Sequence, residues 1–234
     1  NTNGWEDSFV ENMLSVLIPA HNEEKEINRT VRDLTKTLER EKIKHELLVV
    51  NDNSTDRTKE ILNSLSSQFA AVRYVDNAPP NGYGQAVKTG LSAFRGECVA
   101  IVMADGSDDP EDLVKFYRKW SEGYDCVFGN RFSNQSKVID YPWPKLCLNR
   151  LGNHFIGLLF SIDYKDTTNA FKLYGRNVIA SLAPLQSSGF NLTVEMPLKA
   201  IIRNYSYAIV ASNWYNRKQG VSKWKINETV GGYI

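Results

Sequence analysis

Cysteine is scarce in this sequence of 234 residues, and charge of the two signs almost cancels. The three cysteines, Cys98, Cys126 and Cys147, are odd in number and far apart, and two of them lie in apolar runs. This pattern favours buried, reduced thiols over a disulfide framework and indicates a reducing compartment. The 28 basic and 27 acidic residues leave a formal net charge of +1. Because no global field would attract a polyanion, we expect no nucleic-acid partner, and any anion site must be local.

Long hydrophobic runs are absent as well. No segment approaches the roughly 18 to 20 apolar residues of a membrane-spanning helix, and the N-terminus lacks the basic-then-apolar pattern of a signal peptide. The chain begins at Asn1 rather than Met and ends at Ile234, so we expect a trimmed piece of a longer protein, with room for membrane segments beyond either end. With 42% hydrophobic and 24% charged residues, the composition excludes a disordered, collagenous or coiled-coil chain.

Short β-branched runs alternate with apolar residues at helical spacing through the first 130 residues. The expected strands are 14–19, 46–50, 72–75, 98–104 and 125–129, and the expected helices are 23–40, 56–65, 85–94 and 111–120. Strands that alternate with helices in this way form a mainly parallel sheet covered on both faces. The sequence therefore predicts an α/β domain.

The remainder of the chain has a different pattern. A proline-punctuated loop at 133–144 precedes an apolar helix at 146–162, a short strand at 170–174 and a helix at 193–202. No polar linker separates this part from the first, so we expect one compact domain over 1–234.

Polar residues follow three of the expected strands, at 20–24, 51–56 and 105–110. Helix capping alone would account singly for Asn22, Ser54, Thr55 and Asp109. It accounts less well for carboxylates at three strand ends, because the carboxyl ends of parallel strands converge on one edge, where repulsion must be relieved by a cation or by hydrogen-bonding ligands. The pattern therefore indicates a metal and a polar ligand at this edge.

Asp105 follows an apolar run directly and is the most informative of these carboxylates. The hard oxygen donors nearby, without a His or Cys pair at zinc spacing, suit Mg²⁺ or Mn²⁺ held together with substrate phosphates. We therefore expect a diphosphate substrate. The dispersed histidines, His21, His45 and His154, are expected to have structural or surface roles.

Six segments carry a resemblance to a known family: LSVLIPAHNEE, ELLVVNDNSTDRT, GYGQAVKTGL, AIVMADGSDDPEDL, YDCVFGNRF and DTTNAFKLY. In order and spacing they resemble the family 2 glycosyltransferases of the GT-A fold, and most of all the dolichyl- or polyprenyl-phosphate hexosyltransferases. The likeness runs from Leu14 to Glu228. It implies a GT-A fold, with a nucleotide-sugar-binding half over 1–130 and an acceptor-binding half over 131–234.

The same resemblance assigns the donor site. Residues assigned to the nucleotide sugar in this half are Pro19, Ala20, Glu23, Asp52, Gly84 and Ala104. Asp105 matches the second carboxylate of the family's Asp-x-Asp metal motif. The first position is Met103, which cannot ligate Mg²⁺, so either Asp105 holds Mg²⁺ or Mn²⁺ with Ser107 or Asp108, or the metal binds more weakly than in the family. A second departure is Asn51, where the family commonly has an aspartate.

Basic residues dominate between Glu195 and Glu228, where no acidic residue occurs. A solvated basic face is one interpretation. The resemblance favours another, in which Arg217, Ser222 and Lys223 match a loop that closes over the donor diphosphate and excludes water.

The apolar segment 146–160 has no acidic residue and follows Trp143 and Lys145. It reads equally well as a core helix and as an interfacial helix at a membrane surface. By resemblance it rests on the membrane. Cationic contacts to the acceptor phosphate are assigned to Arg131, Arg150 and Lys172, and the orientation of cationic residues to Asp166 and Glu195.

The implied reaction is an inverting transfer of a hexose from a nucleoside-diphosphate sugar to a polyisoprenyl phosphate, at the cytoplasmic face of a membrane. The expected catalytic residues are Asp105, Arg131 and Asp166. Two alternatives stay open: a family 2 enzyme with a soluble or glycan acceptor, and a non-catalytic nucleotide-sugar-binding module, which Met103 would permit. A processive synthase would need a Gln-x-x-Arg-Trp motif and a sugar nucleotidyltransferase a glycine-rich loop after the first strand, and neither is present. The base and the hexose are left open.

Overall fold

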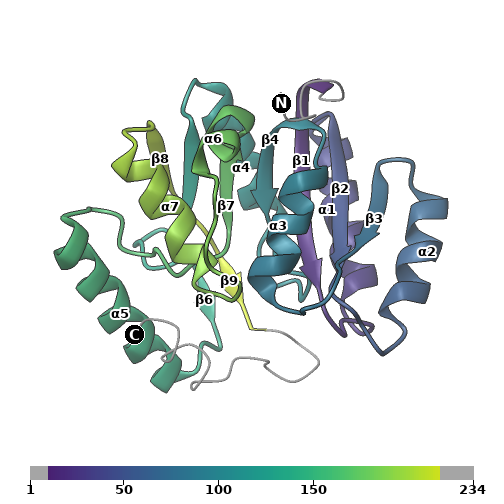
Figure 1. The fold of residues 1–234 in the computed structure, drawn as a ribbon, viewed down its shortest axis with the longest axis horizontal. Helices are drawn as coiled ribbons and strands as arrows, with labels where there is room; N and C mark the ends of the chain where they lie inside the picture. The colour runs from purple at the N-terminus through teal and green to yellow at the C-terminus, as the bar shows by residue number, and fades with distance from the viewer. Residues whose placement is uncertain (1–9, 217–234) are drawn as a thin grey trace.

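The computed structural model describes residues 10–216, whose centre is a seven-stranded sheet (Figure 1). The strand order is β3-β2-β1-β4-β7-β5-β8, and a two-stranded sheet pairs β6 with β9. The strands are β1 (Val10–Ala20), β2 (His45–Asn51), β3 (Val72–Asp76), β4 (Gly96–Ile101), β5 (Cys126–Asn130), β6 (Val138–Ile139), β7 (Lys172–Gly175), β8 (Tyr207–Ala211) and β9 (Trp214–Tyr215). The helices are α1 (Ile27–Arg40), α2 (Thr58–Gln68), α3 (Tyr83–Ala93), α4 (Pro110–Ser121), α5 (Trp143–Phe160), α6 (Arg176–Leu182) and α7 (Leu192–Ile202).

The large sheet is mainly parallel. β1 pairs in parallel with both β2 and β4, and β5 pairs in parallel with β8. Only β7 runs against its neighbours β4 and β5 in the part of the chain described. The expected α/β class with a mainly parallel central sheet is therefore confirmed.

Two apolar cores cover the two faces of this sheet. Val16 and Ile18 pack into the core formed with α1, α2 and α4, whereas Leu17 between them packs into the core formed with α3, α6 and α7. Successive side chains of a strand point to opposite faces, so burial on both sides requires the continuous apolar run that the sequence has here. Figure 1 shows α2 near one end of the molecule and α5 near the other.

The expected helices and strands are all present, with shifted ends. The strand expected at 98–104 ends at Ile101, because β7 pairs with it only from Cys98 to Ile101, and residues 102–104 lead into the loop that holds Asp105. Sequence patterns did not predict β8, α6 or the small sheet. Among residues 10–216, no helix combines the length and apolar character needed to cross a bilayer.

Candidate active site

The loops after β1, β2 and β4 meet at the carboxyl edge of the large sheet. The Asp52 amide donates to the Ala20 carbonyl over 2.8 Å, which ties the second loop to the end of β1. The Asn22 side-chain oxygen accepts from the Thr55 amide at 2.7 Å, and the Ser54 hydroxyl accepts from the Asn22 amide at 3.0 Å. These three residues therefore join two loops instead of capping helices. Only the capping prediction for Asp109 is confirmed, since its carboxylate accepts from the Glu111 amide at the start of α4.

Asp52 is buried and held by two donors. Its Oδ1 accepts from the Asn77 side chain at 2.8 Å, and its Oδ2 accepts from the Gly82 amide at 2.9 Å. Asn77 is itself fixed by the Thr89 hydroxyl at 2.6 Å. The carboxylate thus connects the end of β2 with the beginning of α3, so its position is set before any ligand arrives.

Four residues assigned to the donor shape the backbone of this edge. Pro19 and Ala20 are buried in the last part of β1, paired with β2. The Ala104 side chain lies in the core against α1, and its carbonyl accepts from the Thr30 hydroxyl at 2.9 Å. A Cβ on Gly84 would lie 2.6 Å from the Ser188 carbonyl carbon, so close packing requires glycine there. Their assignment to the nucleotide sugar stays a prediction.

Glu23 lies in the same loop region, partly buried. Its amide donates to the Thr58 hydroxyl at 2.8 Å, at the first residue of α2. Two predicted site residues, Glu23 and Asp52, are therefore brought to neighbouring loops by direct contacts between those loops. This is the convergence that the polar strand ends predicted.

The loop after β4 carries two buried carboxylates. Asp105 Oδ1 accepts from the Ser107 amide at 3.1 Å, and Asp108 Oδ2 accepts from the Met103 amide at 2.9 Å. Burial and the negative charge of Asp105 raise the pKa of Asp108 to about 7, against the opposing effect of the Met103 amide. Met103 therefore contributes to this loop through its main-chain amide, which holds the Asp108 carboxylate.

The donor chemistry of this loop fits a hard divalent cation. Asp105, Asp108 and Ser107 supply carboxylate and hydroxyl oxygens, the ligand types that Mg²⁺ and Mn²⁺ prefer. In the described part of the chain, no group of three His, Cys, Asp or Glu side chains is arranged to hold a metal ion. The loop thus offers a partial ligand set of the kind that substrate phosphate oxygens and water complete.

The segment containing β9 is fastened to the acidic loop, which the sequence did not indicate. Asn213 donates through its amide to Asp112 at 2.6 Å and through its side chain to Asp109 at 3.0 Å. The Tyr215 amide donates to the Ser107 carbonyl at 3.0 Å. The chain is therefore held beside Ser107 just before the predicted loop. Arg217, Ser222 and Lys223 lie outside the described residues.

Arg131 and Asp166 form a buried ion pair. Asp166 is fully buried, and its oxygens accept from the Arg131 amide at 2.8 Å, from Nε at 3.0 Å and from Nη2 at 2.7 Å. Burial lowers the pKa of Arg131, but the Asp166 charge and hydrogen bond outweigh it and raise that pKa above its ordinary value. The expected contact between Asp166 and a cationic residue is present.

Arg131 and Arg150 both contact the Phe132 ring. The guanidinium carbons of Arg131 and Arg150 lie 5.4 and 5.1 Å from the centre of the Phe132 ring. Arg131 is buried, whereas Arg150 is exposed on α5. Two of the three cations assigned to the acceptor are thus gathered around one ring.

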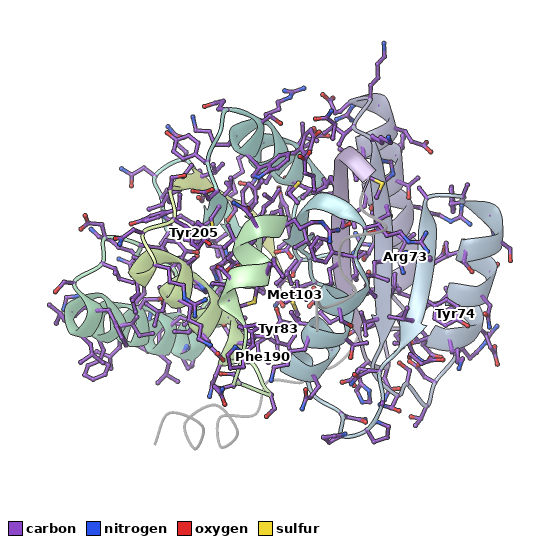
Figure 2. The ribbon with its side chains drawn as sticks, turned by 45° about the horizontal axis from the view of Figure 1, so that its top comes forward. Arg73, Tyr74, Tyr83, Met103, Phe190 and Tyr205 are labelled. Atoms are coloured by element: carbon purple, nitrogen blue, oxygen red, sulfur yellow. The ribbon has the colours of Figure 1, made fainter. Side chains whose placement is uncertain are left out.

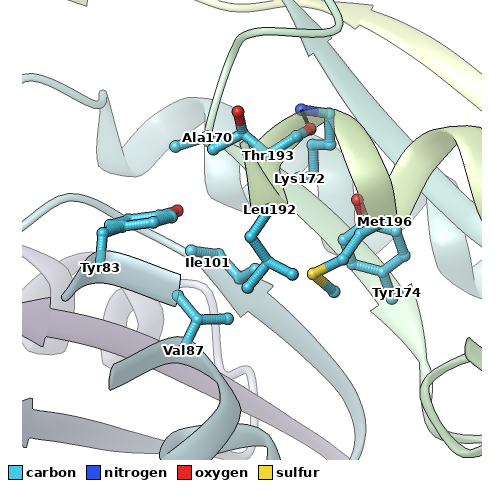
Figure 3. Close-up of a pocket in the computed structure, with 9 residues that line it drawn as sticks. All are labelled: Tyr83, Val87, Ile101, Ala170, Lys172, Tyr174, Leu192, Thr193 and Met196. Carbon is cyan, nitrogen blue, oxygen red and sulfur yellow. Dashed lines mark hydrogen bonds between the residues drawn. The ribbon is translucent and has the colours of Figure 1, made fainter. Parts of the chain in front are cut away.

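Lys172, the third, lies inside the protein (Figure 3). Its ammonium group donates to the carbonyls of Thr167 at 3.0 Å and Thr193 at 3.1 Å, and also to that of Asn169. Burial lowers its pKa to about 7, with Asp166 raising it and Arg131 lowering it. Beside it is a cavity of about 10 Å³, roughly the space of one water molecule. Lys172 therefore stabilises the main chain that follows Asp166, through its hydrogen bonds to the carbonyls of Thr167 and Asn169.

Glu195 supports a different segment. It accepts from the amides of Gln186 at 2.8 Å and Ser187 at 2.7 Å, and pairs with Lys199 at 2.8 Å. Burial raises its pKa, but these donors outweigh burial and lower it to about 2. The expected pairing with a cation is present, and Glu195 also fixes the 186–188 loop against which Gly84 packs.

An aromatic pair beside the site was not predicted as functional. The Tyr83 and Phe190 rings stack with centres 4.3 Å apart (Figure 2). The Tyr83 hydroxyl is buried without a hydrogen-bond partner among the described residues, and the nearby charge of Asp108 adds to burial in raising its pKa. Its motif, GYGQAVKTGL, was the signal available in the sequence.

Helix α5 exposes an apolar face. The side chains of this outer face are Leu151, Phe155, Leu158 and Leu159, which are 68%, 64%, 69% and 63% exposed. They recur at helical spacing and, with no acidic residue anywhere in α5, form an uninterrupted apolar stripe. In the part of the chain that the structure describes, these four side chains are therefore not packed into the core, whereas Ile156 on the inner side of α5 is.

Comparisons with known proteins place these features in context. The sequence model described as "Glycosyl transferase family 2" matches residues 15–182. The chain is 29% identical over 172 residues to the uncharacterized glycosyltransferase YkcC of Bacillus subtilis, covering 74% of the chain and 52% of that relative. It is 28% identical over 214 residues to polyprenol monophosphomannose synthase of Mycolicibacterium smegmatis, covering 89% of the chain and 79% of that protein. The chain thus spans about half the length of the Bacillus relative.

A solved structure shares the fold. Glucosyl-3-phosphoglycerate synthase from Mycobacterium tuberculosis, crystallised with Mn²⁺, uridine diphosphate and phosphoglyceric acid, superimposes with a TM-score of 0.71 at 16% identity, covering 94% of this chain and 74% of that one. At this identity the likeness concerns the architecture alone.

Proposed function

The chain belongs to glycosyltransferase family 2, and on that basis we propose that it transfers a hexose from a nucleoside-diphosphate sugar to a polyisoprenyl phosphate at a membrane surface. The observation that carries the proposal is that α5 both exposes an apolar outer face and carries Arg150, a cation proposed to meet the acceptor phosphate together with Arg131. Arg150 extends from the same helix to the ring that Arg131 also contacts. An apolar surface next to a phosphate-binding pair suits an acceptor that is part lipid and part anion.

The donor half of the proposal lies over residues 1–130. Glu23 and Asp52 would contact the nucleoside, since they follow β1 and β2 at the carboxyl edge of the sheet, where open α/β sheets bind ligands. The solved structure with the same architecture was crystallised with uridine diphosphate. Pro19, Ala20 and Gly84 would give this site its backbone shape.

Asp105, Asp108 and Ser107 would hold Mg²⁺ or Mn²⁺. When bound, the cation would neutralise the charge that develops on the leaving diphosphate. The protein's own part is to hold the two carboxylates in fixed positions through the amides of Ser107 and Met103. Arg217, Ser222 and Lys223 would add cationic and hydroxyl donors to the diphosphate from the following segment.

Arg131 and Arg150 would orient the acceptor phosphate for an in-line attack with inversion. A phosphate monoester is already ionised near neutral pH, so the reaction needs positioning more than a strong base. Asp166 accepts three hydrogen bonds from Arg131, and this occupation suits it to orienting the arginine instead of removing a proton. Lys172 would act indirectly, by fixing the main chain around Asp166.

The outer face of α5 would rest on lipid, at the cytoplasmic surface of a membrane. Apolar side chains gain about 25 cal/mol per Å² when they leave water, and an interfacial helix with cationic neighbours also gains from anionic lipids. Arg150 supplies such a charge on the helix itself. The relative named polyprenol monophosphomannose synthase, 28% identical to this chain, adds support for a lipid acceptor.

A soluble phosphorylated acceptor is the second candidate. The structure that shares this fold was crystallised with phosphoglyceric acid, a small anion that the two arginines would also suit. A binding module without turnover would be favoured if the loop of Met103 held no cation.

The test is a transfer assay with the purified chain, Mg²⁺ or Mn²⁺, and a panel of labelled UDP- and GDP-hexoses. Vesicles carrying a polyisoprenyl phosphate are compared with vesicles carrying the same polyisoprenol without phosphate. The proposal predicts label in the lipid extract only with the phosphate. Donor hydrolysis without transfer to either lipid would overturn the lipid acceptor, and no turnover at all would favour the binding module.

A further inference from the structure

Asn153 lies on the buried side of α5. Among the described residues of that helix, it is the only polar one that is buried. Its Oδ1 accepts from the Thr167 hydroxyl at 2.6 Å and from the Thr168 amide at 3.2 Å. Its Nδ2 donates to the Thr168 hydroxyl at 3.0 Å and to the Asn149 carbonyl at 2.8 Å. One side chain on α5 therefore fixes both a main-chain and two side-chain groups of the neighbouring segment.

One turn beyond Asn153, the inner side of α5 makes apolar contacts. Ile156, three residues further on, packs with Val194 and Leu198 of α7. An apolar residue at 153 would continue that packing, and a buried amide is unfavourable unless its groups are hydrogen-bonded. Asn153 thus fixes the register of the helix against residues 167–168, because displacement of α5 would leave buried donors and acceptors unpaired.

The segment that Asn153 fixes is the one that holds Arg131. Thr167 directly follows Asp166, whose oxygens accept three hydrogen bonds from Arg131. The Thr168 hydroxyl also lies 3.4 Å from Arg131 Nη2. The Asn153 side chain is therefore connected to the Arg131 guanidinium group in two ways. One runs through Thr167 and the main chain to Asp166, and the other through the Thr168 hydroxyl, which contacts both side chains.

We propose that Asn153 is a positioning residue that couples the seating of α5 on a lipid surface to the orientation of Arg131. This inference rests on the proposed function, in which α5 meets lipid and Arg131 meets the acceptor phosphate. Lipid favours one position of α5, the one that buries its outer face. Because the Asn153 side chain is hydrogen-bonded to residues 167 and 168, the position of α5 then sets the position of residues 166–168. Coupling of this kind requires contacts that differ between the seated and unseated helix. The three hydrogen bonds from Asn153 to residues 167 and 168 would be those contacts, whereas its fourth, to the Asn149 carbonyl, lies within α5.

The experiment measures hydrogen exchange with and without vesicles of phosphatidylcholine and phosphatidylglycerol. In the wild type, vesicles should slow exchange at 166–169 and at the Arg131 amide by about fivefold or more, the lower range of ordinary allosteric coupling. In Asn153→Leu, which nearly preserves side-chain size, the protein should still bind vesicles but exchange at these amides should no longer slow. Thr167→Val should behave similarly, because it removes the hydroxyl donor without changing shape, and Thr167→Ser is its matched control.

Activity provides a readout that a purely structural role would not change. With vesicle-borne polyisoprenyl phosphate and the active donor of the hexose panel, Asn153→Leu and Thr167→Val should lose about tenfold or more in kcat, with nucleoside diphosphate affinity unchanged. Thr167→Ser should keep wild-type values. If Asn153→Leu does not fold, Thr167→Val against Thr167→Ser decides the question.

The outcomes separate this inference from the function on which it rests. Equal vesicle-induced slowing in wild type, Asn153→Leu and Thr167→Val would overturn the coupling while leaving the proposed function intact. Vesicle binding by the wild type with no slowing at 166–169 would overturn it as well. A wild type that neither binds vesicles nor transfers hexose to the lipid would remove the proposed function, and the coupling with it.

Discussion

Arg131 binds Asp166 through its main-chain amide and through two nitrogens of its guanidinium group, at 2.8, 3.0 and 2.7 Å. The pair is buried at the end of β5, where the guanidinium group also lies over the Phe132 ring. Two parallel side-chain hydrogen bonds fix the plane of a guanidinium group as well as its position. The orientation of Arg131 therefore follows the position of Asp166 and of the segment that carries it.

Replacement of Asp166 by Asn should destabilise the protein and impair transfer. The substitution leaves the Arg131 charge buried without its counter-charge, which costs about 3 to 5 kcal/mol in comparable pairs. Urea denaturation measures the free energy of unfolding, and Asp33→Asn on the exposed side of α1 is the matched control. An unfolding free energy equal to that of the control would show that the Arg131–Asp166 pair does not stabilise the fold.

Replacement of Asp105 by Ala should abolish divalent-dependent turnover. Asp105 is the carboxylate proposed as the main protein ligand of the cation, whose charge would neutralise the leaving diphosphate. Asp108→Ala should reduce turnover less, because Asp105, not Asp108, is the residue that matches the carboxylate of the family's metal motif. Titration of activity with Mn²⁺ compares the two variants, and a larger loss in Asp108→Ala would reverse the assignment of the ligands.

The sequence predicted the parallel part of the fold because its strands are buried on both faces. Val16, Leu17 and Ile18 form the continuous apolar run that a strand buried on both faces requires. β8 escaped prediction because it is an edge strand of five residues, partly exposed, whose pairing partner β5 is distant in sequence. α6 has only seven residues, too few to show a helical period.

The sequence located the polar strand ends correctly but gave little information about residues that are held by tertiary contacts. Convergence of Asp52 and Asp105 follows from parallel topology alone, since the carboxyl ends of such strands share one edge. Lys172 carried no signal that distinguishes a phosphate ligand from a cation bonded to main-chain carbonyls. The link from Asn153 to residues 167–168 likewise depends on how α5 packs, which no local pattern encodes.

Replacement of Phe155 by Glu should weaken vesicle binding without unfolding the protein. Phe155 is 64% exposed, so a carboxylate there remains hydrated in the free protein but opposes burial in lipid. Co-sedimentation with vesicles containing phosphatidylglycerol measures binding, circular dichroism checks folding, and Ser67→Glu on α2, at the other end of the molecule, is the control. Folded Phe155→Glu that binds as well as the control would contradict the docking role of α5.

The stability of the wild type should rise with pH above neutrality relative to Lys172→Met. The pKa of Lys172 is about 7 in the fold, whereas an unfolded lysine has a pKa of about 10.4. Between these values the unfolded chain binds more protons, so the free energy of unfolding contributed by this group rises by up to about 1.4 kcal/mol per pH unit.

Urea denaturation of both proteins from pH 7 to pH 10 tests this. The difference between wild type and Lys172→Met should grow across the range, while the difference between wild type and Lys36→Met, at an exposed site, should stay constant. Parallel curves for wild type and Lys172→Met would show that the buried amine keeps an ordinary pKa.

The acceptor is the central claim, and competition between the two candidate acceptors tests it most directly. The chain is given its active labelled nucleotide sugar, Mn²⁺, vesicle-borne polyisoprenyl phosphate and 3-phosphoglycerate together, and the label is partitioned between lipid and water. The account predicts label in the lipid phase, with that transfer lost in Arg131→Ala. Label in an aqueous phosphoglycerate product, with none in lipid, would contradict it.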